Sequence, residues 1–231
     1  MLSLRKLIER LQKQYGDPPL PPAHGPFELV LWENACYLLP DERRKEVFEG
    51  LRKQVGLTAK AISAVTDEVL LPLAKRGGMR PETRVFRWRE IARITLTQFD
   101  GNLDTILQEP FSKAKRALKQ FPNIGDPGAE KILLFCGMTE GLPLESNGLR
   151  VLVRVGYGRE QKSYGAMYKS VEDDLAPELK KSSANQLSLT HRLLREHGKT
   201  LCKDKKPLCD ECPLLHGCDY RQRAPRATIS G

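Results

Sequence analysis

Four cysteines lie close together near the end of the sequence, in the stretch LCKDKKPLCDECPLLHGC that begins at Leu201. They are Cys202, Cys209, Cys212 and Cys218, with the spacing C-x6-C-x2-C-x5-C. A disulfide pair, a zinc site or an iron–sulfur cluster could each account for them.

Other features of the chain disfavour disulfide bonds. With 231 residues, the chain has ample core to bury and does not need the covalent links of a very small secreted domain. Its first stretch, MLSLRKLIERLQKQYG, is charged every few positions and resembles neither a signal peptide nor a membrane span. Cys36 and Cys136 lie in apolar helical patterns and are interpreted as buried free thiols. We therefore expect a reducing compartment and a metal site.

The spacing of the thiols also bears on the choice of metal. A site made only of thiolates selects a soft metal, which leaves zinc and iron–sulfur. Structural zinc usually takes its ligands as two close pairs, whereas this stretch has one close pair, Cys209 and Cys212, between single cysteines. Such uneven spacing favours a bulky cluster held at its corners, with zinc as the alternative.

The charge of the chain points to an anionic partner. Lysine and arginine number 38 against 29 acidic residues, for a formal charge of +9. The isoelectric point is near 9.3. A basic excess is expected of a protein that binds phosphates, although many basic proteins bind no nucleic acid.

Helical patterns dominate the chain. Apolar residues of the first segment recur every three or four positions up to Gly16, and a proline-rich connector follows over residues 17–26. No run of alternating β-branched residues is present, so we expect an all-α protein. Further helices are expected over residues 27–39, 41–56, 58–75, 81–99, 102–108, 110–120, 127–137, 145–156, 163–179 and 182–197.

The stretch ALKQFPNIGDPGAEKILLFCG, from Ala117, is the second informative region. It predicts a tight hairpin between two helices, with Asp126 as the N-cap and Pro127 as the first residue of the second helix. Asn123 and Gly125 tolerate the positive φ that so sharp a turn requires. The backbone N–H groups at such a helix start could hold a phosphate oxygen, or the turn could be a plain helix connection.

At this point the sequence resembles a known family. FPNIGDPGAEKIL is similar to the helix-hairpin-helix motif of the endonuclease III superfamily of DNA glycosylases, the HhH-GPD superfamily. GLPLESNGLRV corresponds to the segment in which that family carries a catalytic aspartate followed by an R-V pair. The cysteine spacing is the one with which endonuclease III and the adenine-mismatch glycosylases hold a 4Fe-4S cluster. The resemblance covers roughly residues 26–222.

The resemblance implies a two-lobed all-α fold and a partner, double-stranded DNA with a damaged or mismatched base. It implies a monomer that acts in the cytoplasm on the nucleoid, without membrane contact. We expect an N-terminal helix and connector (1–25), a helical core (26–160) with the hairpin at about 117–137, a C-terminal cluster lobe (161–223) and a tail (224–231).

The resemblance also implies which residues act on the DNA. A 4Fe-4S cluster on the four cysteines would fix the loop between Cys202 and Cys209, so that its lysines reach phosphates as fixed charges. The expected DNA contacts are Asn123, Ile124, Gly125 and Gly128 of the hairpin and Lys203, Lys205 and Lys206 of the loop.

The chain departs from the family at the lysine that forms a Schiff base in bifunctional members. That position is Pro127, which cannot be a nucleophile. Lys131 lies one helical turn further and could point the same way, although we expect it to face solvent. The family pattern therefore predicts an N-glycosylase without appreciable AP lyase activity.

The family aspartate corresponds to Glu145, which keeps a carboxylate with one extra methylene. Its expected task is to stabilise the positive charge that grows on the sugar, or to position the attacking water. The alternative is that Glu145 only caps the following helix. Ser146 and Asn147 also replace family residues, so we expect a base pocket of different shape.

The helix after the connector carries the third departure. A glutamine of the endonuclease III pocket becomes Leu38, and polar residues occur one turn earlier at Glu33 and Asn34. In adenine-mismatch glycosylases an acid in this helix protonates the leaving base, so we hypothesise that Glu33 or Asn34 faces the base pocket. The alternative is that they bond the backbone of a neighbouring loop. Trp32 and Tyr37 could line the same pocket or pack in the core.

Two other functions stay open from the sequence. Pro127 and the altered surroundings of Glu145 are compatible with a DNA-binding protein that has kept the hairpin and the cluster but lost catalysis. A zinc-bearing interaction module is the other alternative.

Overall fold

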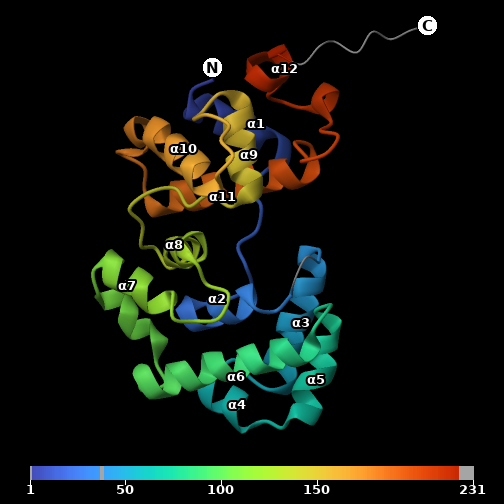
Figure 1. Cartoon of the computed structure of the whole chain (residues 1–231), viewed down its shortest axis with the longest axis vertical. Helices are drawn as coiled ribbons and strands as arrows, with labels where there is room; N and C mark the ends of the chain where they lie inside the picture. The colour runs from blue at the N-terminus through green and yellow to red at the C-terminus, as the bar shows by residue number, and fades with distance from the viewer. Residues whose placement is uncertain (1, 37–38, 224–231) are drawn as a thin grey trace, which may run out of the picture. The chain divides into compact units, whose positions relative to one another are not determined.

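The protein was analysed as a computed structural model, which describes residues 2–36 and 39–223. Within those ranges every regular element is helical and no strand occurs, which confirms the expected all-α class (Figure 1). The chain divides into two compact units, one formed by Pro21–Thr139 and the other by Met1–Leu20 together with Glu140–Gly231. No helix in the described ranges is long and apolar enough to cross a membrane.

The unit of residues 21–139 is called here the hairpin unit. Its core includes the fully buried side chains of Phe48, Trp88 and Ile132. α6 packs against both α4 and α5, and α7 packs against α8 (Figure 1). Its helices are α2 (Gly25–Glu33), α3 (Asp41–Gln54), α4 (Ala59–Ala64), α5 (Asp67–Arg76), α6 (Pro81–Gln98), the 3-10 helix η1 (Leu103–Gln108), α7 (Phe111–Leu118) and α8 (Asp126–Phe135).

The other unit is called here the cysteine unit. Its centre is α11 (Ala184–Thr200), which packs against α9 (Ser146–Val155) and α1 (Leu4–Tyr15). α11 begins with a complete capping box between Ser183 and Gln186. The remaining elements are α10 (Tyr164–Leu179), the 3-10 turns η2 (Cys209–Glu211) and η3 (Leu215–Gly217), and α12 (Asp219–Arg223). Residues 140–160, which we grouped with the hairpin, belong to this unit.

Two predicted helices are shorter than expected. The helix predicted over residues 27–39 ends at Glu33. Asn34 is its C-cap residue, and the side-chain amide of Asn34 donates to the carbonyl of Pro122. The pattern over residues 58–75 is two helices, since Val65 has an extended backbone and the Arg89 guanidinium donates to the carbonyl of Ile62 at 2.6 Å. Residues 103–108 form a 3-10 helix.

Candidate nucleic-acid interface and catalytic site

The hairpin connects α7 to α8 through a turn that the sequence predicted in part. Asn123 adopts the left-handed conformation, with φ 60°, as expected. Gly125 does not, because its φ is −93° and it is the N-cap residue of α8. Asp126 and Pro127 are therefore the first residues inside the helix rather than its cap and first residue. The prediction was wrong by one position because Asp126 binds lysines instead of the helix N–H groups.

The surroundings of Gly125 and Gly128 in the hairpin leave room for a larger side chain at either position. A Cβ atom added to Gly125 would meet nothing within 4 Å, and one added to Gly128 would meet only a methyl group of Ile124, at 3.8 Å. Open space beside the first N–H groups of a helix suits the close approach of an anion. Ile124 differs, since its side chain is buried and its N–H donates to Phe121.

Ion pairs join the two hairpin helices. Lys119, the C-cap residue of α7, donates to the carboxylate of Asp126 at 2.8 Å, and Lys115 of α7 lies 3.2 Å from the same group. Lys115 also binds Glu130, one turn further along α8. Lys119, followed by Lys115, lowers the pKa of Asp126 below its ordinary value. The lysines thus offset an acidic group that would otherwise repel an anion at this helix start.

Lys131 does not face solvent, so that expectation was wrong. Its ammonium lies 2.8 Å from the carboxylate of Glu33, and only 17% and 18% of the two side chains are exposed. Arg44 lies 3.9 Å from the same carboxylate and covers the ring of Trp32 at 5.4 Å. Trp32 itself is buried against the edge of Phe48, as a core residue would be. The packing of α2 against α8 brings this pair together.

Asn34 is committed to the backbone. Its side-chain amide donates to the carbonyl oxygens of Val30 at 3.0 Å and Pro122 at 2.9 Å. Its own carbonyl oxygen is buried and has no hydrogen-bond partner within the described residues. The residue thereby ties α2 to the hairpin turn, as in the alternative considered above. Tyr37 and Leu38 lie outside the described residues.

Glu145 is the N-cap of α9. One carboxylate oxygen accepts the N–H of Gly148 at 2.7 Å, and the other accepts the side-chain amide of Asn147, also at 2.7 Å. Both of these donors are neutral. Burial, with the charge of Glu145 as a smaller cause, raises the pKa of Tyr164 above its ordinary value.

The loop that leads to Glu145 is held by two other helices. His191 of α11 bonds the carbonyl of Pro143 at 2.7 Å. On α10, the Tyr168 hydroxyl accepts the N–H of Leu144 and the Tyr164 hydroxyl donates to the carbonyl of the same residue, each at 3.4 Å. Sequence patterns could not reveal these bonds, because they join segments far apart in the chain.

A second set of bonds runs from Glu145 to the cysteines. Arg150 donates to the side-chain oxygen of Asn147 and to the carbonyl of Gly198, both at 2.8 Å. Its Nε donates to the carbonyl of Cys202 at 2.9 Å. The R-V pair of the family pattern was the only signal for Arg150, and it indicated no partner.

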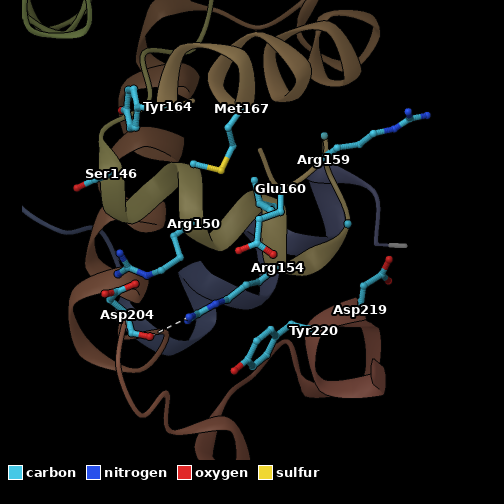
Figure 2. Close-up of a pocket in the computed structure, with 13 residues that line it drawn as sticks. Ser146, Arg150, Arg154, Arg159, Glu160, Tyr164, Met167, Asp204, Asp219 and Tyr220 are labelled. Atoms are coloured by element: carbon cyan, nitrogen blue, oxygen red, sulfur yellow. Dashed lines mark hydrogen bonds between the residues drawn. The ribbon is translucent and has the colours of Figure 1, made fainter. Parts of the chain in front are cut away.

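The cysteine unit contains a cleft of about 1250 Å³ over the outer face of α9. Ser146, beside Glu145, lines one end, and Tyr220 of α12 lines another side. Figure 2 shows the side chains of Arg150 and Arg154 directed toward the loop that carries Asp204. The lining therefore combines the helix of Glu145 with the loop of the cysteines.

All four clustered cysteines are free thiols of this unit. The pKa of the Cys212 thiol is raised to about 11, mainly by burial, with smaller contributions from Cys202, Cys218 and Cys209. Within residues 2–36 and 39–223, no group of three or more histidine, cysteine or carboxylate side chains is placed to hold one metal ion. Four thiolates in one unit are the donor set that either zinc or an iron–sulfur cluster would require.

The loop of residues 203–206 is exposed, and with it Lys203, Lys205 and Lys206. Lys206 has a left-handed backbone with φ 57°. The segment is closed by a bond of 2.9 Å from the N–H of Leu208 to the carbonyl of Leu201. Its lysines thus project from a loop of defined shape.

Met79 is a candidate that the sequence did not reveal. It is 71% exposed, at the tip of a turn between α5 and α6 in which Gly78 and Arg80 have φ of 94° and 58°. The buried Arg84 holds that turn by donating to the carbonyls of Ala74 at 2.7 Å and of Met79 at 3.3 Å. An apolar side chain on so constrained a turn is suited to inserting between bases.

Comparisons with known proteins agree with this architecture. Endonuclease III of Sulfolobus acidocaldarius is 32% identical over 121 residues, and the chain spans about half of that relative, 51% of its length. Thymine-DNA glycosylase of Aeropyrum pernix is 26% identical over 225 residues, 94% of each chain. A solved endonuclease III in a non-covalent complex with DNA has a TM-score of 0.74 at 21% identity, covering 96% of this chain and 98% of that one. No protein-family model matches the chain.

The fold and its turn at Asn123 define a protein of the all-α helix-hairpin-helix class. In sequence, the chain is similar to endonuclease III and to a thymine-DNA glycosylase, which are DNA glycosylases of the helix-hairpin-helix superfamily that its residues resemble.

Proposed function

We propose that this protein is a DNA repair glycosylase that binds duplex DNA, extrudes one damaged or mismatched base and cleaves its N-glycosidic bond. The observation that carries the proposal is the carboxylate of Glu145, which two neutral donors hold at the start of α9. The names of the relatives support the same class of reaction. The protein would act as a monomer in the cytoplasm, on nucleoid DNA.

Two regions of the protein would bind the DNA backbone. At the hairpin, Gly125 and Gly128 leave room for a phosphate beside the first N–H groups of α8. In the cysteine unit, the exposed lysines of residues 203–206 would contact the sugar-phosphate backbone. Such contacts carry no sequence information, as expected of an enzyme that searches for lesions.

The four free thiols would hold a 4Fe-4S cluster. When bound, the cluster supplies a rigid support for the lysine loop rather than a chemical step. Zinc is the alternative occupant, and colour separates the two, because only the iron–sulfur protein absorbs visible light.

Extrusion of a base costs a few kcal/mol and is least costly where pairing is already weakened. Met79 is suited to fill the space that the base leaves, since it is exposed on a turn held by Arg84. Ser146, which lines the cleft over α9 beside Glu145, would contact the extruded base.

In the chemical step the bond between C1′ and the base nitrogen breaks, and its electron pair leaves with the base. The anionic Glu145 would stabilise the positive charge that grows on the sugar or orient the water that then adds at C1′. Neutral donors leave its negative charge undiminished, which suits this task. One proton of that water stays on the new C1′ hydroxyl, and the other passes through solvent to the departed base.

A Schiff base would not form in this protein. Pro127 replaces the family lysine, and the ammonium of Lys131 is paired with Glu33 at 2.8 Å. A side chain committed to this ion pair is not available as a nucleophile. The proposed activity is therefore monofunctional, and treatment with borohydride during reaction should trap no covalent adduct between protein and DNA.

The proposal is tested with a panel of duplex oligonucleotides that carry uracil, oxidised pyrimidines, alkylated bases, T·G mispairs or A·8-oxoguanine mispairs. We expect the wild type to release a base from at least one duplex and Glu145→Gln to bind that duplex without releasing it. Tight binding without release on every duplex would instead identify a non-catalytic DNA-binding member of the superfamily.

A further inference from the structure

We propose that Arg154 is a positioning residue, which shapes the lysine loop and donates a hydrogen bond to the sulfur of its first cysteine. The inference rests on the proposed function in one respect, namely that the loop contacts phosphates and its cysteines hold a cluster. The geometry of the loop itself is independent of that function.

The guanidinium of Arg154 binds the loop at several successive residues. One nitrogen donates to the carbonyl of Lys203 at 2.7 Å and lies 3.4 Å from both the carbonyl and the sulfur of Cys202. The other donates to the carbonyl of Asp204 at 3.0 Å. Three consecutive carbonyls therefore turn toward one side chain, which fixes the path of the loop's backbone.

Arg154 is itself held in place from the opposite side. The ring of Tyr220, on α12, lies 4.7 Å from the guanidinium carbon. The carbonyl of Arg154 accepts the thiol of Cys218 at 3.2 Å. One residue of α9 thus contacts both the first and the last of the four cysteines.

Arginine is the side chain that this arrangement needs. Its planar guanidinium presents several donors at fixed angles, so it can bind neighbouring carbonyls at once, whereas the ammonium of a lysine is a point charge on a flexible stem. A cationic donor to a ligating sulfur also withdraws electron density from it, which raises the reduction potential of a bound cluster. Arg154 would therefore set both the shape of the loop and the potential of the site.

The test compares Arg154→Lys with wild type, because lysine keeps the positive charge but lacks the planar guanidinium and its several N–H donors. Arg159→Gln is the matched control, since Arg159 lines the same cleft but points away from the loop in Figure 2. Tyr220→Leu is a second variant that removes the ring over Arg154 and leaves the arginine in place. Three measurements are made on the full-length purified proteins: amide hydrogen exchange of residues 203–208, the salt dependence of duplex binding, and the reduction potential by voltammetry.

In Arg154→Lys we expect exchange in the loop to be about tenfold faster, because its carbonyls are no longer held. The slope of log affinity against log salt concentration should decrease in magnitude by about one for each phosphate that the loop no longer neutralises. The potential should move to more negative values. Tyr220→Leu should shift all three readouts in the same direction by less, and Arg159→Gln should behave as wild type.

Loop exchange and potential that match wild type in Arg154→Lys would overturn the inference. Equal changes in Arg159→Gln would also overturn it, because they would show a general effect of the cleft. A colourless protein that does not bind duplex would defeat the proposed function instead. Loop exchange would then decide the positioning role of Arg154 alone, since that readout needs neither cluster nor DNA.

Discussion

Two carboxylates that the sequence marked as candidate catalytic residues, Glu33 and Glu145, have very different surroundings. Glu33, in the hairpin unit, is paired with the ammonium of Lys131 at 2.8 Å and lies 3.9 Å from Arg44. Glu145, in the cysteine unit, accepts hydrogen bonds from the amide groups of Asn147 and Gly148. The first is a carboxylate neutralised by cations, and the second is a carboxylate oriented by dipoles.

The difference indicates what each group can do. A carboxylate that is to stabilise a growing cation must be fixed in position without having its charge cancelled beforehand, and neutral donors meet both conditions. A carboxylate paired with a half-buried lysine contributes to packing, and removing either partner leaves the other charge uncompensated. We therefore assign chemistry to Glu145 and mainly a structural role to the pair of Glu33 and Lys131.

The largest expected effect concerns the charge of Glu145. Glu145→Gln should slow base release by about 10²- to 10³-fold while duplex affinity stays within about twofold, because the removed interaction acts only in the transition state. Single-turnover release from a duplex that the wild type processes measures the rate. Glu33→Gln is the matched control and should slow release far less. If the two variants were equally slow, the assignment of different roles would be wrong.

The second effect concerns the position of Glu145. Asn147→Ala removes one of its two donors and an acceptor of Arg150, so the carboxylate should turn and base release should fall by roughly tenfold. The same single-turnover assay, with duplex affinity beside it, separates this loss from weaker binding. Lys131→Met, which removes the partner of the other carboxylate, should leave the rate close to that of wild type. If Asn147→Ala released the base at the wild-type rate, the hydrogen bond from the N–H of Gly148 would be enough to hold the Glu145 carboxylate in position.

The sequence predicted backbone features better than the partners of charged groups. Asn123 was correctly assigned a left-handed turn, since its residue type and its place between two helices limit the choices. Lys131 was wrongly placed in solvent, because its partner on α2 lies almost a hundred positions away in the chain. Arg154 was missed for the same reason, although its loop was recognised. Helical periodicity is local, whereas an ion pair depends on how helices pack.

The third effect is on stability. Lys131→Met and Glu33→Gln should each lower the free energy of unfolding by roughly 1–2 kcal/mol, because each leaves a half-buried charge without its partner. The double variant should lose less than the sum, and the difference measures the coupling of the pair. Chemical denaturation followed by circular dichroism gives these values. Glu145→Gln, which can still accept at the helix start, should lose less than about 1 kcal/mol. Additive losses for Lys131 and Glu33 would show that the pair is not coupled.

The smallest effect tests whether the hairpin unit serves binding rather than chemistry. Gly125 has φ −93° and open space at its Cβ position, so Gly125→Ala should change the free energy of unfolding by no more than about 0.5 kcal/mol. The new methyl group would lie beside the first N–H groups of α8, where a phosphate is expected, so duplex affinity should fall several-fold.

Base release from the bound duplex should keep its wild-type rate in Gly125→Ala, in contrast to Glu145→Gln. Unchanged duplex affinity in Gly125→Ala would mean that DNA does not approach α8 at this glycine. The lysines of residues 203–206 would then have to supply most of the binding free energy for the duplex.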